Sequence, residues 1–217
     1  MGASEGWRTF GAGPILATAE PDPYVERHAQ AEVHLAERLY HELARLLRKE
    51  RGHDSSRVVL YLVAGRYDRP PPMPGALVRT LHPDSVAEPL AMPLARLLVE
   101  RWFGSGALEA GFFLDGIAGL ALARSGLGAT VTEADAWVQA EMAAGRPVSI
   151  FSSSSPALTS FAAFLQGRFG TEPMQRFLAS YDPIRRDEAA LAAYERTLGA
   201  LEPYLLQLRL EMGAANA

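Results

Sequence analysis

The chain has 217 residues, of which 48% are hydrophobic and 21% are charged, a balance typical of a folded globular protein rather than a disordered one. Its formal net charge of −4 argues against a nucleic-acid-binding protein, because such a protein needs a basic face to neutralise phosphates. The absence of cysteine excludes disulfides, thiolate nucleophiles and cysteine metal ligands.

No part of the sequence approaches the run of about 18 apolar residues that a membrane-spanning helix needs. The N-terminal residues 1–6 lack the basic region and apolar run of a secretory signal. We therefore expect a soluble protein with no membrane span, either cytoplasmic or exported after removal of a signal.

The first half of the chain predicts a mixed α/β arrangement. Residues 8–20 have the character of an extended segment, and the turn-forming Pro21-Asp22-Pro23 ends it. A long helix is expected from about Pro23 to Arg51, because apolar residues recur on one side of it at helical spacing. These apolar residues are Val25, Ala29, Ala36, Leu39, Leu43, Leu46 and Leu47.

Two strands are expected after this helix. Residues 57–65 (RVVLYLVAG) are rich in β-branched and aromatic residues and end at a glycine. Residues 76–82 (ALVRTLH) are the expected partner strand, across a proline-rich loop.

From about Asp84 onward almost every signal is helical. Helices are expected to break at Gly104, 126–128, 145–147, 152–155, Gly170 and Pro183. The segment 132–135 (TEAD) resembles a capping box that opens a helix to about Ala144, and Thr171 is expected to open another. Leu158, Phe161, Phe164, Leu165 and Phe169 form an apolar stripe in between. The last helices are expected at about 187–198 and 202–212.

These elements predict an α+β fold in one domain, 1–217. Its first lobe, about 8–83, is a small mixed α/β lobe, and its second, about 84–213, is mainly helical.

Several segments resemble, in order and spacing, the gluzincin type of zinc peptidase (peptidase MA-like). Residues 24–47 and 57–65 are similar to the opening helix and first long strand of that family. The segments 92–104 (MPLARLLVERWFG) and 112–122 (FFLDGIAGLAL) stand where the family carries its H-E-x-x-H helix and its third ligand helix. Residues 155–181 and 198–209 resemble the helices that follow, so the similarity covers roughly 24–212.

The resemblance places changed residues at every catalytic position. Met92 falls on the first histidine ligand, Pro93 on the general base, Arg96 on the second histidine and Asp115 on the glutamate ligand. An arginine cannot lose its proton to become a zinc ligand, and a proline cannot accept a proton from metal-bound water. The resemblance therefore implies a domain with no catalytic residues, no metal and no cofactor.

Two structural expectations follow at these positions. Proline inside a helix removes a donor and clashes with the preceding turn, so the helix should begin or kink near Met92. Arg96 and Asp115, at two former ligand positions, should face each other as a charge-assisted pair.

The expected function is that of a catalytically inactive metallopeptidase-like domain with a binding or scaffolding role. Its ligand would be a peptide, a protein or a small molecule held in the former active-site cleft, with His82 and Glu88 as cleft-lining residues. Two alternatives stay open. One is a hydrolase that uses non-zinc chemistry around His82, Glu88 and Asp115, and the other is a structural module that forms a homodimer.

One further cluster could bind metal. His34, Glu37 and His41 share one face of the first helix, which is formally a ligand set. This face lies opposite the apolar stripe, so a solvated surface is the favoured interpretation.

Overall fold

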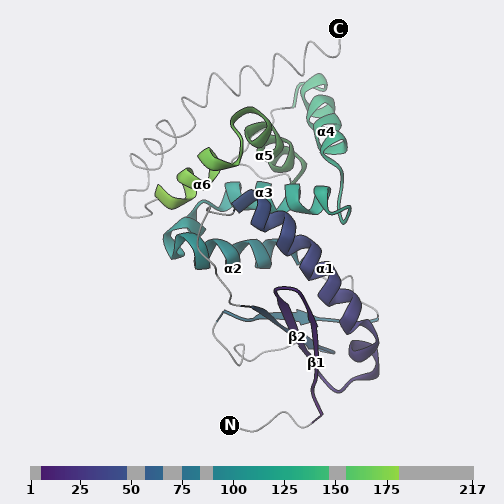
Figure 1. Ribbon diagram of the computed structural model, residues 1–217. Helices are drawn as coiled ribbons and strands as arrows, with labels where there is room; N and C mark the ends of the chain where they lie inside the picture. The colour runs from purple at the N-terminus through teal and green to yellow at the C-terminus, as the bar shows by residue number, and fades with distance from the viewer. Residues whose placement is uncertain (1–5, 48–56, 66–74, 84–89, 147–154, 181–217) are drawn as a thin grey trace. The chain divides into compact units, whose positions relative to one another are not determined.

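The computed structural model describes residues 6–47, 57–65, 75–83, 90–146 and 155–180 (Figure 1). It has the α+β fold expected from the sequence, with one small mixed sheet and several helices. The chain divides into two compact units. The first consists of Met1–His41 and Arg51–Leu94, and the second of Glu42–Glu50 and Ala95–Ala217. The helices expected beyond Ser180 lie outside the described residues.

The first unit contains a four-stranded sheet with the order β1-β2-β3-β4. Strands β1 (Arg8–Ala12) and β2 (Ile15–Ala19) are antiparallel, while β3 (Val58–Val63) runs parallel to β2 and β4 (Leu77–Thr80) runs parallel to β3. Both strands that were expected after the first helix are therefore confirmed, each slightly shorter than predicted.

The single extended segment expected at 8–20 is instead a hairpin. Ala12 pairs with Ile15, so Gly13 and Pro14 alone make the turn. Gly13 has φ of 50°, and a two-residue hairpin loop that begins with glycine is one of the preferred kinds, because glycine adopts positive φ without a steric cost. The turn was not predicted because β-forming residues both precede and follow it.

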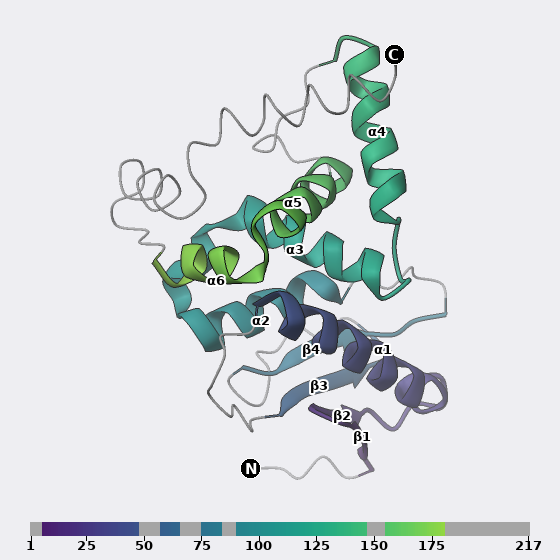
Figure 2. The same cartoon turned by 45° about the horizontal axis from the view of Figure 1, so that its top comes forward.

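Helix α1 (Pro23–Leu47) covers one face of the sheet in the first unit (Figure 2). It begins as predicted, because Asp22 caps it. Asp22 Oδ1 accepts hydrogen bonds from the backbone N–H groups of Tyr24 at 2.8 Å and Val25 at 3.0 Å, and Pro23 occupies the first helical position, where no N–H is needed. Every apolar residue predicted for the buried side of this helix is buried.

Alternate residues of the strands face α1. The buried positions are Ile15, Ala17 and Ala19 in β2 and Val58, Leu60 and Leu62 in β3, each paired in register with its neighbour. In β4, Arg79 pairs with Leu62 and so shares this face. Its Nε lies 2.5 Å from Glu32 Oε2 of α1, and the two side chains are only 9% and 16% exposed. A largely buried ion pair thus joins β4 to the helix.

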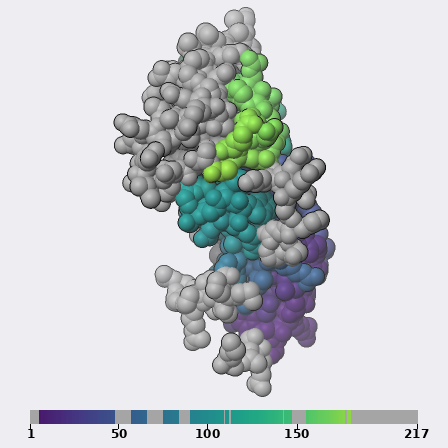
Figure 3. Space-filling model, turned by 60° about the vertical axis from the view of Figure 1, so that its left-hand side comes forward, coloured from purple at the N-terminus to yellow at the C-terminus, as the bar shows by residue number. Residues whose placement is uncertain are grey.

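The second unit is helical. Helix α2 (Ala91–Phe103) enters it from the first unit and is followed by the 3-10 helix η1 (Ser105–Glu109), α3 (Gly111–Arg124), α4 (Val131–Ala143), α5 (Ser155–Phe169) and α6 (Thr171–Ser180). Gly104 and Gly170 have φ of 90° and 78°, so the breaks predicted there are confirmed. Helix α6 packs against η1. In Figure 3, the yellow-green atoms of α6 lie beside the teal atoms of the segment that contains η1.

The start of α4 differs from the prediction by two residues. Thr130, not Thr132, is the cap: its Oγ1 accepts a hydrogen bond from the backbone N–H of Glu133 at 3.2 Å. Glu133 Oε2 in return accepts the backbone N–H of Thr130 at 2.7 Å. This reciprocal pair is a capping box that begins two residues before the predicted segment 132–135.

Candidate functional site

Met92 and Pro93, which the resemblance assigns to catalytic positions, lie in the first turn of α2. The helix begins at Ala91, which confirms the prediction that Pro93 forces it to start near Met92. The first backbone hydrogen bond runs from the N–H of Leu94 to the carbonyl of Leu90 at 3.1 Å, so Pro93 sits where its missing donor costs nothing. Met92 is half-buried and Pro93 is exposed. Neither side chain carries the imidazole or carboxylate donors that the zinc site of a peptidase needs.

Arg96 and Asp115, which the resemblance assigns to ligand positions, belong to the second unit. Arg96 is an exposed residue of α2, and Asp115 is a half-buried residue of α3, the neighbouring helix in Figures 1 and 2. Partial burial of the Asp115 carboxyl raises its pKa above the usual aspartate value, and the positive charge of Arg96 partly opposes that rise. Arg96 is therefore near enough for its field to reach the Asp115 carboxylate.

The closed ion pair expected between these residues is not formed. In the part of the chain that the structure describes, neither Arg96 nor Asp115 takes part in a hydrogen bond or a close ion pair. The sequence showed that the two charges belong to successive helices. It could not show whether the side chains meet, because that depends on the separation of the helices and on the rotamers.

Glycines precede and follow Asp115 on α3, and the space around them differs between the turn before Asp115 and the turn after it. Among the described residues, no atom lies within 4 Å of a Cβ placed at Gly111, one turn before Asp115. A Cβ at Gly119, one turn after it, would lie 2.0 Å from Thr159 Oγ1, and one at Gly116 would lie 2.7 Å from the carbonyl oxygen of Leu158. Helix α3 therefore lies directly against α5 in the turn that follows Asp115, whereas no described atom adjoins the position of Gly111 in the turn before it.

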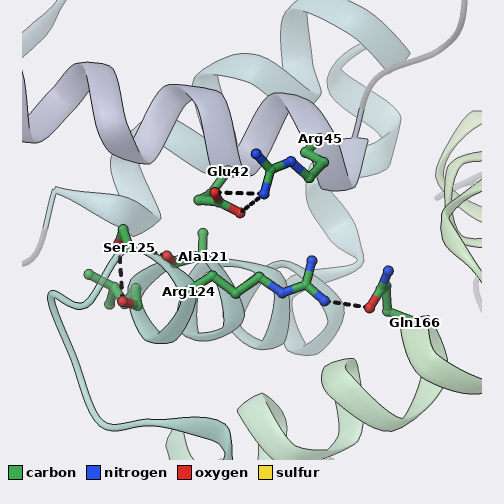
Figure 4. A network of polar contacts seen from close by, with 7 residues as sticks. Glu42, Arg45, Ala121, Arg124, Ser125 and Gln166 are labelled. Carbon is green, nitrogen blue, oxygen red and sulfur yellow. Dashed lines mark hydrogen bonds and ion pairs between the residues drawn. The ribbon is translucent and has the colours of Figure 1, made fainter.

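Hydrogen bonds connect α3, the helix that contains Asp115, with its neighbouring helices. Arg124 at the end of α3 donates a hydrogen bond of 2.5 Å to Gln166 Oε1 of α5, and Ser125 Oγ donates to the carbonyl of Ala121 at 2.7 Å (Figure 4). Ser160 of α5, only 3% exposed, donates a hydrogen bond of 2.5 Å to Asp135 Oδ1 of α4. Side-chain hydrogen bonds thus connect α5 with both α3 and α4.

The apolar stripe predicted on α5 is only partly buried. Leu158, Phe161 and Leu165 are core residues, whereas Phe164 and Phe169 are half-exposed. The glycine spacing in GFFLDGIAGLAL is a sequence signal for close helix packing, and it could have identified Gly116 and Gly119 as the contact with this helix.

The prediction that His82 and Glu88 line a cleft is not tested by the described residues. His82 is exposed just after β4, in the first unit. Glu88 lies outside the described residues. The alternative of non-zinc hydrolysis around His82, Glu88 and Asp115 stays a prediction.

The cluster on α1 is a solvated surface. His34 and His41 are exposed, with His34 Nδ1 at 3.5 Å and His41 Nε2 at 4.0 Å from different oxygens of Glu37. Across the described ranges, no group of three or more His, Cys, Asp or Glu side chains is arranged to hold a metal ion.

Comparison of the chain with protein-family models, with curated proteins and with solved structures found no match. None of the helices in the described part combines the length and the apolar character needed to cross a membrane.

Proposed function

We propose that the chain is a gluzincin-like domain that has lost zinc catalysis and acts by binding a peptide, protein or small molecule at the former ligand positions. The observation that carries this proposal is that Met92, Pro93 and Arg96 stand where the resemblance expects two zinc ligands and a general base, and none of them can serve as either. The resemblance assigns Arg96 and Asp115 to two ligands of one ion. Such positions must come close together on neighbouring helices, and the effect of Arg96 on the pKa of Asp115 supports that proximity.

The chemistry of these residues favours binding over hydrolysis. A zinc peptidase activates a metal-bound water and gives its proton to a carboxylate. The fixed positive charge of Arg96 repels a metal cation, and Pro93 has no group that accepts a proton. Asp115 is left as a single carboxylate beside a cation, which is a site for charged ligands rather than for a metal.

The experiment restores the family's ligands. In the purified natural chain, elemental analysis should find no stoichiometric zinc, and casein or fluorogenic peptides should not be hydrolysed. A variant with Met92→His, Pro93→Glu, Arg96→His and Asp115→Glu should bind about one zinc ion per chain, because it has the ligand set and spacing of the family.

A matched control introduces a histidine pair with the same spacing elsewhere. Glu172 and Arg176 are exposed and one turn apart on α6, so Glu172→His with Arg176→His tests whether any such pair captures zinc. If the restored variant binds zinc no more tightly than this control, the assignment of Met92, Arg96 and Asp115 to ligand positions is wrong. Peptide hydrolysis by the natural chain that disappears on Asp115→Ala would refute the loss of catalysis.

A further inference from the structure

Strand β1 lies at one edge of the described sheet, where β2 is its neighbour on the inner side (Figure 2). Ala12 and Ile15 flank a two-residue turn, so they form a hydrogen-bonded pair, and such pairs alternate along the hairpin. The N–H and C=O groups of Thr9 and Gly11 therefore point away from β2, and both residues are exposed. Strand β1 thus offers backbone donors and acceptors to a further strand.

The sequence of β1 lacks the features that protect an edge strand from pairing. It contains no proline, and its register with β2 runs without a bulge from Arg8 to Ala12. Its one charged residue, Arg8, pairs with the buried Ala19 and so lies on the face that α1 covers. There Arg8 contacts Glu26 Oε2 at 3.1 Å, which offsets its charge. No residue of β1 therefore prevents pairing with another strand.

The backbone pattern of β1 is complementary to itself. Thr9 and Gly11 lie symmetrically about Phe10, which is half-exposed. In an antiparallel pair of two β1 strands centred on Phe10, Thr9 of each copy lies opposite Gly11 of the other, and the two residues exchange both hydrogen bonds. The two Phe10 side chains then lie opposite each other, and aromatic cross-strand pairs stabilise a sheet.

The charges are complementary in the same alignment. Arg8 of one copy lies opposite Ala12 of the other, next to Gly13. Glu37 of α1 lies against this turn, because a Cβ placed on Gly13 would be 2.6 Å from Glu37 Oε1. The alignment therefore brings Arg8 of each copy to Glu37 of the other.

Both side chains are able to make this contact. Arg8 is 68% exposed, and its guanidinium has further donors besides the one that contacts Glu26. Glu37 is 27% exposed, and its neighbours His34 and His41 lie at 3.5 and 4.0 Å from its oxygens. These distances exceed the roughly 2.7–2.9 Å of a charge-assisted hydrogen bond, so an arginine would bind the Glu37 carboxylate more closely than either histidine does.

We propose that two copies of the chain associate through β1, antiparallel about Phe10, with Arg8 of each copy on Glu37 of the other. A second copy is favoured over an unrelated extended peptide, because both the backbone pattern and the charges of this edge match themselves. The interface lies within the first unit. It is independent of the proposed binding function, since neither zinc nor the former ligand positions take part in it.

The first test is sedimentation equilibrium of the full chain over a range of concentrations, which should show a reversible equilibrium of monomer and dimer. Gly11→Pro removes an outward N–H and should weaken association about tenfold or more. Gly11→Ala is the matched control, because it keeps the N–H and its Cβ would lie at an ordinary 3.6 Å from the carbonyl oxygen of Ile15. It should leave association unchanged. Circular dichroism checks that both variants fold.

The second test exchanges the charges. Arg8→Glu alone and Glu37→Arg alone each place like charges at both contacts of the dimer, so each should weaken association about tenfold or more. A mixture of these two variants places opposite charges at both contacts and should associate nearly as tightly as the natural chain. Mixing could not restore association if either variant had failed to fold.

Three results would each overturn the proposal. The natural chain could stay monomeric at every concentration, even if β1 then bound an unrelated extended peptide. Gly11→Pro and Gly11→Ala could associate equally well. The mixture of the two charge variants could associate no more tightly than either variant alone. None of these results bears on the zinc-restoration experiment.

Discussion

Thr159 of α5 occupies the space that any side chain at position 119 of α3 would need. A Cβ placed on Gly119 would lie 2.0 Å from Thr159 Oγ1, well inside the contact distance of the two atoms. A Cβ placed on Gly116 would likewise lie too close to the backbone of Leu158, at 2.7 Å from its carbonyl oxygen. Small residues on α3 thus let it approach α5 closely, which fixes the helix that carries Asp115.

Gly119→Ala should therefore destabilise the protein, although alanine is the better helix former. Overpacking costs about 1–3 kcal/mol, while the gain in helix propensity is at most about 1 kcal/mol. Adding Thr159→Ala should recover most of the loss, since the obstructing oxygen is then absent. Urea unfolding measures both variants. Gly167→Ala, at an open position of α5, should instead be neutral or stabilising. Equal stabilities for the substitutions at 119 and 167 would contradict the close packing.

The ion pair of Glu32 and Arg79 should contribute strongly to the stability of the first unit. Removing one partner of a buried pair leaves the other charge without compensation and typically costs about 3–5 kcal/mol. Arg79→Met should therefore lower the free energy of unfolding clearly, and Arg79→Met with Glu32→Leu should recover much of that loss. The matched control is Glu172→Gln in α6, whose pair with Arg176 is 76% and 59% exposed and should change stability by less than about 1 kcal/mol. Equal effects of Arg79→Met and Glu172→Gln would show that burial does not distinguish these pairs.

Thr130 should matter for α4 and Thr132 should not. Thr130→Ala removes the oxygen that caps the N–H of Glu133 and should cost about 1 kcal/mol. Thr132→Ala leaves the capping box intact and improves helix propensity, so it should be neutral or slightly stabilising. Thermal unfolding of the two variants decides between the observed cap and the one predicted from the sequence. A greater loss of stability for Thr132→Ala than for Thr130→Ala would support the cap predicted from the sequence.

Asp115 should make stability depend on pH in a definite direction. Its folded-state pKa is raised by burial, so its carboxyl favours folding while protonated. That contribution is complete below the usual aspartate pKa of about 3.9 and is lost as pH rises through the raised folded-state pKa. Compared with Asp115→Asn, the natural chain should become relatively less stable across this window. Arg96→Gln removes the opposing charge and should extend the window to higher pH.

Glu133 provides a control of opposite sign. Hydrogen bonds from the backbone and side chain of Thr130 lower its pKa, so it stabilises the fold at pH above the usual glutamate value and loses that effect as pH falls. The natural chain should therefore lose stability relative to Glu133→Gln on acidification. Parallel pH profiles for the two substitutions would contradict the assigned directions.

The elements that could be predicted are those with several agreeing local signals. Helix α1 combines a capping aspartate, a proline at its first position and a regular apolar stripe, and both its start and its buried face were predicted correctly. Pro93 fixed the start of α2 for a similar reason, because proline allows few positions in a helix. Such features depend only on residues that are close together in the sequence.

The errors arise where neighbouring residues offer equivalent choices. Thr130 and Thr132 can both cap a helix, and the choice depends on which oxygen meets an N–H group. The turn at Gly13 and Pro14 lies within a continuous β-forming run, so only strand pairing reveals it. The separation of Arg96 from Asp115 is set by packing between helices, which residue spacing does not encode.

The pairing of Arg79 with Glu32 also selects the register of β4. This strand has only four residues, and side chains alternate between the two faces of a sheet. A slip of one residue against β3 would turn Arg79 to the face away from α1 and leave Glu32 with no cation in its place. The slipped arrangement would thus lose an ion pair as well as apolar contacts. A single arginine thus disfavours a one-residue slip of a very short strand.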